Sequence, residues 1–561
     1  MKNKKNFYIA SFLLIAVGLW LVFKYRHYFN TYHTPVMITD RTLAEPVLGI
    51  YDRSGKLSGK SPENIRHFVL QLGSDIDQQE IRDKFFKEAG THVLITVESG
   101  GDNVLARVAD GDLDEMIESL CEAFPKENKN IYLRWNPEME VPVQHYSWQY
   151  HAPHDYVEAF RHFSKICKKV SPAVNIVWGP AGYPGTEEYW PGADAVDIVS
   201  ITVGSKSELL ATAFPPEKNR ITDIRRKIHR VRFMDKPLFI LGSESVRDAS
   251  GVKKQLAKAI SETEREAATI YGTIGKLSPL KGPADTDRKL LVGVYDPKQL
   301  LLKSPQVHVE HIFIDLGNIQ DGKFDEEFTA IMQRGHDAIV TVEPWRDKKI
   351  RKDTNVMLNT INGVYDPEFN EVFRIIAEAK HTVYVRFAHE MEIPIHRYAW
   401  QSQDPVLYIK AFRHFMSLQK VGTPNIKKVW GPAGDRGSME WWPGQDVVDY
   451  VSIAIYGLPD KNITDPTKQE SFETIYDRKI HRVLLTRKPM FVTEFGVKGP
   501  EDFQQKWMEN AAKTIGKHQE IVGACYFNLA DNPEVWGNIP APDWGISKET
   551  FDHFVKTLSD R

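Results

Sequence analysis

Two rhythms of hydrophobic and polar residues run along the chain. Short apolar runs are separated by longer stretches in which apolar residues recur at helical spacing, for example Val406, Ile409, Phe412 and Met416 within Pro405–Lys420. This alternation predicts strand–helix units. In the second half of the chain it predicts eight strands, at Leu291–Asp296, His311–Leu316, Ala338–Glu343, Val383–Ala388, Ile426–Gly431, Val448–Tyr456, Pro489–Phe495 and Ile521–Asn528.

The same unit occurs twice in the chain. IYLRWNPEMEVPVQHYSWQY, from Ile131, aligns with VYVRFAHEMEIPIHRYAWQS, from Val383, with 9 identities in 20 positions and an offset of 252 residues. The same offset joins Val177–Pro180 with Val429–Pro432. A period of this length indicates a duplicated domain, because solenoids are built from much shorter repeats.

Each copy has the size of a (β/α)8 barrel. Eight strand–helix units in about 250 residues are typical of this fold, and the first copy offers eight matching strands between Leu48 and Ile274. Doubly wound open sheets are the alternative, but no glycine-rich phosphate turn follows the first strand. We therefore predict an α/β chain of two tandem TIM barrels, at 46–275 and 290–561, joined by a linker at 276–289.

An apolar segment without a charged residue lies near the N-terminus. Phe7–Phe23 follows three lysines and is just long enough to span about 30 Å of hydrocarbon. Lys24 and Arg26 stand where a signal peptide would have small residues for cleavage. We predict a cytoplasmic N-terminus at 1–6, a single-pass transmembrane anchor at 7–24, a spacer at 25–45, and barrels outside the cytoplasm, in the periplasm or at the cell surface.

Composition and charge are those of a globular protein that does not bind nucleic acid. Hydrophobic residues make up 42% of the 561 residues, and the net charge is −3 without a long basic block. The three cysteines Cys121, Cys167 and Cys525 lack the spacing of a zinc site. A Cys121–Cys167 bridge is one interpretation, but buried free thiols are favoured. No metal or cofactor is predicted, although the acidic loop at 435–446 leaves bound calcium open.

Two glutamates fall at strand ends of the second copy. In a TIM barrel the chemistry lies at the C-terminal ends of the strands. Glu390 follows the fourth predicted strand and Glu494 ends the seventh, so both carboxylates should face one cleft. Glycoside cleavage needs such a pair, one acid to protonate the leaving oxygen and one carboxylate to attack the anomeric carbon. An ion pair at the barrel mouth is the alternative for either residue alone.

Further side chains are predicted to surround this pair. Tyr456 ends the sixth strand, where its hydroxyl can orient Glu494, and Arg386 and His389 precede Glu390. For His389 a structural role is an equal alternative. Flat aromatic rings suit the apolar faces of sugars, although core packing is the alternative for each ring. The predicted substrate contacts are Trp345, Trp400, Trp441, Trp442 and Trp536.

The second copy resembles glycoside hydrolase family 26, which has a clan A TIM barrel. The motifs that carry the resemblance are Arg386-Phe-Ala-His-Glu-Met, Tyr398-Ala-Trp400, Val429-Trp-Gly-Pro, Trp442-Pro-Gly-Gln-Asp-Val-Val-Asp, Tyr456-Gly and Lys488-Pro-Met-Phe-Val-Thr-Glu494-Phe-Gly. The resemblance implies a retaining mechanism with Glu390 as acid/base, Glu494 as nucleophile and Tyr456 assisting. The family often has Asn after His-Glu-Met, whereas this chain has Glu392, which predicts an extra carboxylate among the substrate contacts.

The first copy resembles the same family but departs from it at the nucleophile. Glu138 stands at the acid/base position, whereas the positions of Glu494 and Tyr456 map to Gly242 and Gly204. Without the nucleophile most of the rate should be lost. Glu244 lies two residues on, so a shifted register is the alternative to a pseudo-enzyme. Trp148 remains, so glycan binding and a purely structural role are both open for this copy.

Two classes of function follow from these features. One is a membrane-anchored endo-β-glycanase acting on a β-linked polysaccharide, with mixed-linkage or β-1,4-glucan favoured over β-mannan, in association with a polysaccharide synthase or export complex. The other is a non-catalytic glycan-binding or scaffold protein. The arrangement of Glu390 and Glu494 discriminates between them, because carboxyl groups about 5–5.5 Å apart make retaining catalysis feasible.

Overall fold

The computed structural model divides the chain into two compact units, with the boundary between Thr263 and Glu264. The structure describes residues 46–57, 65–72, 77–87, 92–125, 130–243, 246, 249–272, 290–345, 355–394, 397–420, 422–457, 470–533 and 540–559. The predicted anchor at 7–24, most of the spacer and the linker at 276–289 lie outside these residues. Within the described ranges, no helix has both the length and the hydrophobicity to cross a bilayer.

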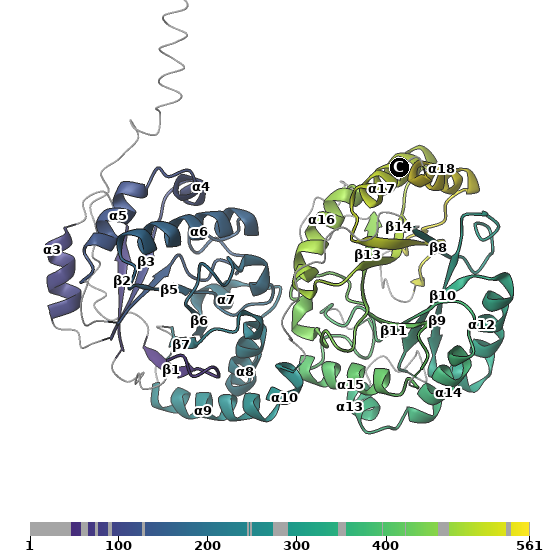
Figure 1. Cartoon of the computed structure of the whole chain (residues 1–561), viewed down its shortest axis with the longest axis horizontal. Helices are drawn as coiled ribbons and strands as arrows, with labels where there is room; N and C mark the ends of the chain where they lie inside the picture. Colours follow the sequence, from purple (N-terminus) through teal and green to yellow (C-terminus); the bar gives the residue numbers. More distant parts are fainter. Residues whose placement is uncertain are drawn as a thin grey trace, which may run out of the picture. The chain divides into compact units, whose positions relative to one another are not determined.

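The second unit is a closed barrel of eight parallel strands (Figure 1). The strands are β8 (Leu291–Tyr295), β9 (Val309–Asp315), β10 (Asp337–Glu343), β11 (Val383–Phe387), β12 (Ile426–Trp430), β13 (Tyr450–Gly457), β14 (Met490–Val497) and β15 (Ile521–Phe527). Hydrogen bonding between β15 and β8 closes the barrel. All eight strands predicted for this half are confirmed, with their ends within two residues of the expected positions.

Helices surround this barrel, and apolar side chains pack inside it. The helical segments are α10 (Ala267–Ile270), α11 (Leu316–Gln320), α12 (Lys323–Arg334), α13 (Val356–Ile361), α14 (Asp366–Ala377), α15 (Pro405–Ser417), η5 (Ser438–Trp441), α16 (Phe472–Val483), η6 (Leu484–Thr486), α17 (Glu501–Lys517) and α18 (Lys548–Ser559). Val309, Ile339, Tyr384, Val429 and Phe491 form one buried cluster inside the barrel. Each comes from a different strand, as the layered interior of this fold requires.

The first unit is an open sheet in the described residues. Its strands are β1 (Val47–Tyr51), β2 (Ile65–Gln71), β3 (His92–Glu98), β4 (Asn130–Trp135), β5 (Asn175–Trp178), β6 (Ile198–Val203) and β7 (Leu238–Gly242). They lie in the order β1-β7-β6-β5-β4-β3-β2. Its helical segments are α3 (Gln78–Ile81), η2 (Arg82–Lys87), α4 (Val104–Ala109), α5 (Asp114–Glu122), α6 (Pro153–Val170), η3 (Thr186–Tyr189), α7 (Lys206–Leu210), α8 (Arg220–Arg230), η4 (Arg232–Met234) and α9 (Ala249–Arg265).

The prediction of a second closed barrel is therefore wrong for this unit. The strand expected to end near Ile274 would begin where the chain is still helical in α10, and residues from 273 to 289 are outside the described part. In the described residues no eighth parallel strand lies beside β7. This edge of β7 pairs instead with β1, which runs antiparallel to it.

The reversed strand β1 occupies space that a larger residue at 242 would need. Gly242 donates its N–H to the carbonyl oxygen of Pro46 at 2.9 Å. A Cβ placed on Gly242 would lie 3.2–3.3 Å from the side chain of Leu48. Leu48 is buried, so the absence of a side chain at 242 and the position of β1 depend on each other.

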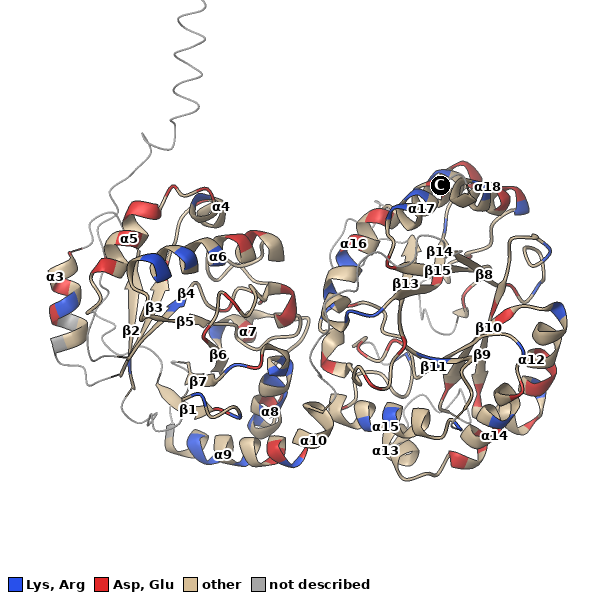
Figure 2. Cartoon of the chain, viewed as in Figure 1, with Lys and Arg blue, Asp and Glu red and all other residues tan. Residues whose placement is uncertain are grey.

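A disulfide joins α5 and α6 of the first unit. Cys121 and Cys167 are paired, with their Cα atoms 5.5 Å apart, while Cys525 is a buried free thiol. The preference for free thiols at Cys121 and Cys167 is therefore wrong, because the packing of the two helices brings these side chains together. Figure 2 shows basic and acidic residues interspersed over the helices of both units, in agreement with the near-neutral net charge.

Candidate active site

Glu390 lies in a tight turn directly after β11, at the mouth of the barrel. Ala388 and Glu390 both have left-handed backbone, with φ of 45° and 53°. Two hydrogen bonds hold this turn against the neighbouring strands, from Ala388 N–H to Val342 O at 3.0 Å and from Glu390 N–H to Gly431 O at 2.8 Å. Strained backbone of this kind persists where the surrounding structure determines it and clusters at active sites.

Glu494 lies within β14 and is held by two donors from neighbouring strands. Arg386 of β11 forms an ion pair with Oε1, and the hydroxyl of Tyr456 from β13 donates to Oε2 at 3.0 Å. Arg386 also donates to the hydroxyl of Thr493. Each oxygen of Glu494 therefore accepts a hydrogen bond, which is the arrangement that stabilises an ionised carboxylate.

The two glutamates occupy opposite electrostatic environments. Burial, together with the negative charge of Glu494, raises the pKa of Glu390 to about 7. Burial, assisted by Glu494, also raises the pKa of Tyr456 well above 10, so its phenol remains a proton donor. Glu390 keeps a partly exposed edge whereas Glu494 is buried. Glu390 is thus poised to carry a proton, while both carboxylate oxygens of Glu494 accept hydrogen bonds from neighbouring strands, a difference in surroundings of the kind that separates acid/base from nucleophile.

Partly exposed aromatic residues line the barrel mouth beside this pair. Tyr295 and Phe527 stack at 4.7 Å between ring centroids, Phe313 lies 5.1 Å from Tyr295, and Tyr456 lies 6.1 Å from Phe527. Burial is the main reason that the pKa of Tyr295 rises to about 12, and the negative charges of Glu343 and Glu494 also raise it. Sequence reasoning missed Tyr295, Phe313 and Phe527. The available signal was that each is an aromatic residue near the C-terminal end of a barrel strand.

The predicted tryptophans lie mostly in the protein interior. Trp400 and Trp442 are fully buried, and Trp345 and Trp441 are less than a tenth exposed. Trp442 packs edge-to-face on Trp430. Trp400 and Trp442 therefore act as packing residues and not as open platforms for a sugar, and Trp536 lies outside the described residues.

Trp400 supports the turn that carries Glu390. Its indole N–H donates to the carbonyl oxygen of His389 at 2.7 Å, and Gln401 donates to the carbonyl oxygen of Glu390 at 3.0 Å. Tyr398 stacks on Trp400 at 4.7 Å and lies 5.0 Å from His389. Burial, with the charge of Arg386, lowers the pKa of His389 well below 6.5, so the imidazole is neutral.

Glu392 has a different role from the one predicted. Its Oε1 accepts hydrogen bonds from the N–H groups of Gly434 at 3.0 Å and Asp435 at 3.1 Å, and from the hydroxyl of Ser438 at 2.8 Å. The side chain is buried. It anchors the loop between β12 and η5 and does not present a carboxylate to the cleft. Glu140 makes the same type of contact in the first unit.

A polar layer lies beneath the two glutamates. The ring of His311 contacts the hydroxyl of Thr341 through Nε2 at 2.8 Å and the backbone oxygen of Thr493 through Nδ1 at 3.2 Å. Burial and the nearby charge of Arg386 lower the pKa of His311 well below 6.5. In the first unit His67 contacts Thr96 in the same way, at 2.7 Å. This pair therefore belongs to the fold shared by both units.

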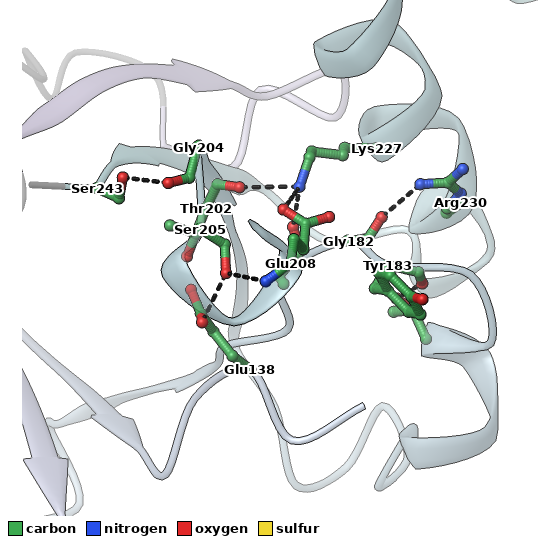
Figure 3. Close-up of polar contacts among 12 residues, drawn as sticks. Glu138, Gly182, Tyr183, Thr202, Gly204, Ser205, Glu208, Lys227, Arg230 and Ser243 are labelled. Carbon is green, nitrogen blue, oxygen red and sulfur yellow. Dashed lines mark hydrogen bonds and ion pairs between the residues drawn. The ribbon is translucent and has the colours of Figure 1, made fainter. Parts of the chain in front are cut away.

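Glu138, the counterpart of Glu390 in the first unit, is hydrogen-bonded to the residue that caps the short helix α7 (Figure 3). Ser205 caps α7, accepting from Glu208 N–H at 3.3 Å, and its hydroxyl donates to Glu138 at 2.7 Å. Glu208 pairs with Lys227, whose ammonium also donates to the carbonyl oxygens of Ala181 and Thr202. Glu208 and Lys227 are both buried, and their opposite charges are in contact inside the unit.

Among the described residues of the degenerate site, no carboxylate stands at the nucleophile position. The space beside Gly242 is occupied by Leu48, and the carbonyl of Gly204 accepts the hydroxyl of Ser243. Trp148 is buried and donates to the carbonyl oxygen of Pro137 at 2.7 Å, as Trp400 does in the second unit. Glu244 lies outside the described residues.

No group of three or more side chains suitable for holding a metal ion occurs in the part of the chain that the structure describes. In the acidic loop at 435–446, Asp446 pairs with Arg413 through two hydrogen bonds, at 2.9 and 2.6 Å.

Comparison with known proteins yields one relative of moderate identity. No family model matches the chain. The chain is 31% identical over 233 residues to a β-1,3-xylanase from a Vibrio species. This match covers 36% of the chain and 49% of the relative. The chain thus spans about half the length of that protein.

Solved structures of similar fold include two family 26 mannanases. One is a β-mannanase from Bacteroides ovatus, with 15% identity, 48% of this chain and 88% of the other covered, and a TM-score of 0.35. The other is an endo-β-1,4-mannanase from a Bacillus species, with 14% identity, coverage of 49% and 86%, and a TM-score of 0.37. Likenesses at this level support no inference about function. The second unit is thus a closed (β/α)8 barrel whose motifs around its two strand-end glutamates resemble those of glycoside hydrolase family 26.

Proposed function

We propose that the protein is a retaining endo-β-glycan hydrolase whose second unit carries the reaction. The observation that supports this most directly is the contrast between the two glutamates at the barrel mouth. Glu494 has donors on both carboxylate oxygens, and Glu390 retains a proton up to a pH of about 7. Retaining glycosidases need a nucleophilic carboxylate and a protonated acid on one sugar.

The reaction proceeds in two balanced steps. Glu494 attacks the anomeric carbon while the proton of Glu390 passes to the departing glycosidic oxygen, which leaves a covalent glycosyl–enzyme and an ionised Glu390. Glu390 then takes a proton from water, whose oxygen displaces Glu494 and restores both carboxyl groups. Tyr456 and Arg386 keep Glu494 oriented in both steps. Nδ1 of neutral His389 is buried and has no hydrogen-bond partner among the described residues.

The substrate we propose is an uncharged β-linked polysaccharide. Mixed-linkage glucan, β-1,4-glucan and β-mannan were the expectations from the sequence, and the name of the Vibrio relative adds β-1,3-xylan. The partly exposed aromatic rings of Tyr295, Phe313 and Phe527 suit the apolar faces of such sugars. Their position beside Glu494 makes them the candidates for contacts with the sugar being cleaved.

The same proposal includes a location outside the cytoplasm. The Cys121–Cys167 disulfide supports it, because structural disulfides persist in oxidising compartments. The apolar segment at 7–24 would anchor the chain in the membrane, and a polysaccharide synthase or export complex is the partner we expect there.

The deciding experiment compares the full chain with Glu494→Gln and Glu390→Gln on a panel of mannan, mixed-linkage glucan, β-1,4-glucan and β-1,3-xylan. Product lengths should show internal cleavage, with retained anomeric configuration by NMR. Glu494→Gln should lower kcat by at least about a thousandfold, because no other carboxylate replaces the nucleophile. Equal activity of the wild-type chain and Glu494→Gln would reject the mechanism and favour a glycan-binding scaffold.

A further inference from the structure

A loop of the first unit presents aromatic and imidazole side chains to solvent. The segment Gln144–His151 follows β4 at the end of the sheet where Glu138 lies, and we call it the rim loop. Within it the side chain of Tyr150 is 63% exposed, and those of His145 and His151 are also exposed. Tyr150 is among the most exposed large hydrophobic residues in the described part of the chain, and its flat ring can pack on a ligand.

The rim loop is held rigidly by its two buried residues. Trp148 donates to the carbonyl oxygen of Pro137, and Gln149 donates to the carbonyl oxygen of Glu138 at 2.8 Å and to the hydroxyl of Ser207 at 2.9 Å. Gln149 also accepts from Tyr146 N–H at 3.0 Å. Ser207 belongs to α7, whose Leu209 and Leu210 are 63% and 59% exposed. A fixed loop loses little conformational entropy when a ligand binds to it.

The second unit uses the same turn without the exposed ring. Ser402 stands at the position of Tyr150, and both have left-handed backbone, with φ of 51° and 65°. The hydroxyl of Ser402 bonds to the carbonyl oxygen of Ile393 at 2.9 Å, so its side chain serves the loop. The fold therefore accepts a small residue there, and the ring of Tyr150 is not required by the turn.

The chemistry of the rim loop selects a class of ligand. None of its eight residues carries a formal charge, if the histidines are neutral. Nε2 of His151 donates to the carbonyl oxygen of Ser147 at 3.0 Å, which leaves Nδ1 as an acceptor. An aromatic face beside uncharged donors and acceptors suits a neutral sugar and offers nothing to a phosphate or an acidic peptide. Glu138 and Ser205, which follow β4 and β6, are buried and in contact with each other, so binding would take place at the surface.

We propose that the rim loop, with Tyr150 as its platform, is a non-catalytic binding site for an uncharged β-linked polysaccharide. The site would hold a polymer that the second unit cleaves, and only this choice of ligand class rests on the proposed function. It replaces Trp148 as the contact expected in the first unit, since Trp148 is buried beneath the loop.

Retention of the full chain in gels containing mixed-linkage glucan, mannan or β-1,3-xylan tests the site. Glu494→Gln serves as the parent, so that the polymer is not degraded. Tyr150→Ser, which installs the residue of the second unit, should weaken retention about five- to tenfold through loss of one aromatic contact. The matched control is Leu300→Ser, because Leu300 is a 56% exposed apolar residue of the second unit, and it should leave retention unchanged.

The outcomes separate this site from the proposed activity. Tyr150→Ser in an otherwise wild-type chain should hydrolyse a short soluble oligosaccharide at the wild-type rate. Unchanged retention of a folded Tyr150→Ser chain overturns the site, even where the wild-type chain is active. Equal losses in Tyr150→Ser and Leu300→Ser also overturn it, because they indicate non-specific adhesion. Loss in Tyr150→Ser alone supports the site, including in the case where no hydrolysis is detected for any variant.

Discussion

At the scale of single residues, two glutamates of the same chemical type acquire different roles from their surroundings. Glu494 is bonded by Arg386 and Tyr456, whereas Glu390 is raised in pKa by burial and by the charge of Glu494. Neither residue could be assigned its protonation state from its position in the sequence. The assignment depends on which side chains the barrel brings within contact.

The raised pKa of Glu390 predicts the alkaline limit of activity. Glu390 must be protonated to assist the leaving group, so activity is present below its pKa of about 7 and is lost as the pH rises through that value. A profile of kcat/KM against pH on a polysaccharide checks this. An aryl glycoside whose leaving group needs no proton serves as the control, and its kcat/KM should not decline near pH 7. A decline that is the same for both substrates would assign it to another group.

Glu392 and its counterpart Glu140 show how one acidic residue can stabilise a loop. Replacing Glu392 by Ala leaves two backbone N–H groups without their acceptor, while the hydroxyl of Ser438 keeps the carbonyl oxygen of Asp435. We expect the free energy of unfolding to fall by about 3 kcal/mol, measured by urea denaturation. Glu392→Gln keeps an acceptor oxygen and should be close to wild type, and Glu140→Ala should show a comparable loss. A raised KM in Glu392→Gln at unchanged stability would instead indicate a substrate contact.

At the scale of secondary structure, the strands of the second unit could be predicted and the topology of the first could not. The apolar run Val47–Tyr51 has the same pattern as Leu291–Tyr295, yet one strand is antiparallel to its neighbour and the other parallel. Local pattern defines a strand but not its partner, because the partner depends on which sheet edge is open. In the described residues β1 takes this edge of β7, where a closed barrel would have an eighth parallel strand.

The candidate site divides in the same way between predictable and unpredictable parts. Glu390 and Glu494 could be located because a barrel turns strand order into position. Burial of Trp400 and Trp442 could not be predicted, since an aromatic residue in a loop has the same sequence signature whether it faces a cleft or the core. Tyr295 was overlooked because it counted as an apolar strand residue, although its place at the strand end matches that of Glu494.

The pairing of β1 with β7 predicts that the nucleophile cannot be restored by one substitution. In the background of Glu494→Gln, Gly242→Glu should give no hydrolysis, because its side chain would be forced against Leu48. It should also destabilise the first unit by about 1–3 kcal/mol through overpacking, measured by thermal or urea unfolding. Gly242→Ala, which adds only the Cβ, should show a smaller loss. Measurable hydrolysis by the double variant would show that β1 is easily displaced from its position beside residue 242.

At the scale of the whole molecule, the two copies of one unit have diverged in opposite directions. The second has a closed barrel in which Arg386 and Tyr456 bond to Glu494, whereas in the first Leu48 lies beside Gly242 and Ser205 bonds to Glu138. Both retain the His–Thr contact beneath the site. The shared features are thus those of folding, and the differences lie where catalysis would occur.

The disulfide makes a prediction that separates the two units. Cys121→Ser with Cys167→Ser should lower the free energy of unfolding of the first unit by about 2–4 kcal/mol, because the bridge closes a long loop of the unfolded chain. Activity of the second unit should be unchanged. Urea unfolding with and without a reductant checks this, and the reductant should have no effect on the double variant. A parallel loss of activity would mean that the second unit depends on the stability of the first.

The direction of β1 also determines the face by which the chain enters the first unit. Because β1 is antiparallel to β7, the carbonyl of Pro46 meets Gly242 at the C-terminal end of that strand, on the side of Tyr150 and α7. In the second unit Leu291 starts a parallel strand, so entry is from the opposite end of the barrel. A load applied through Pro46 would consequently reach the first unit at the strand end that also carries the rim loop, whereas a load applied through Leu291 would reach the second unit at the end away from Glu390.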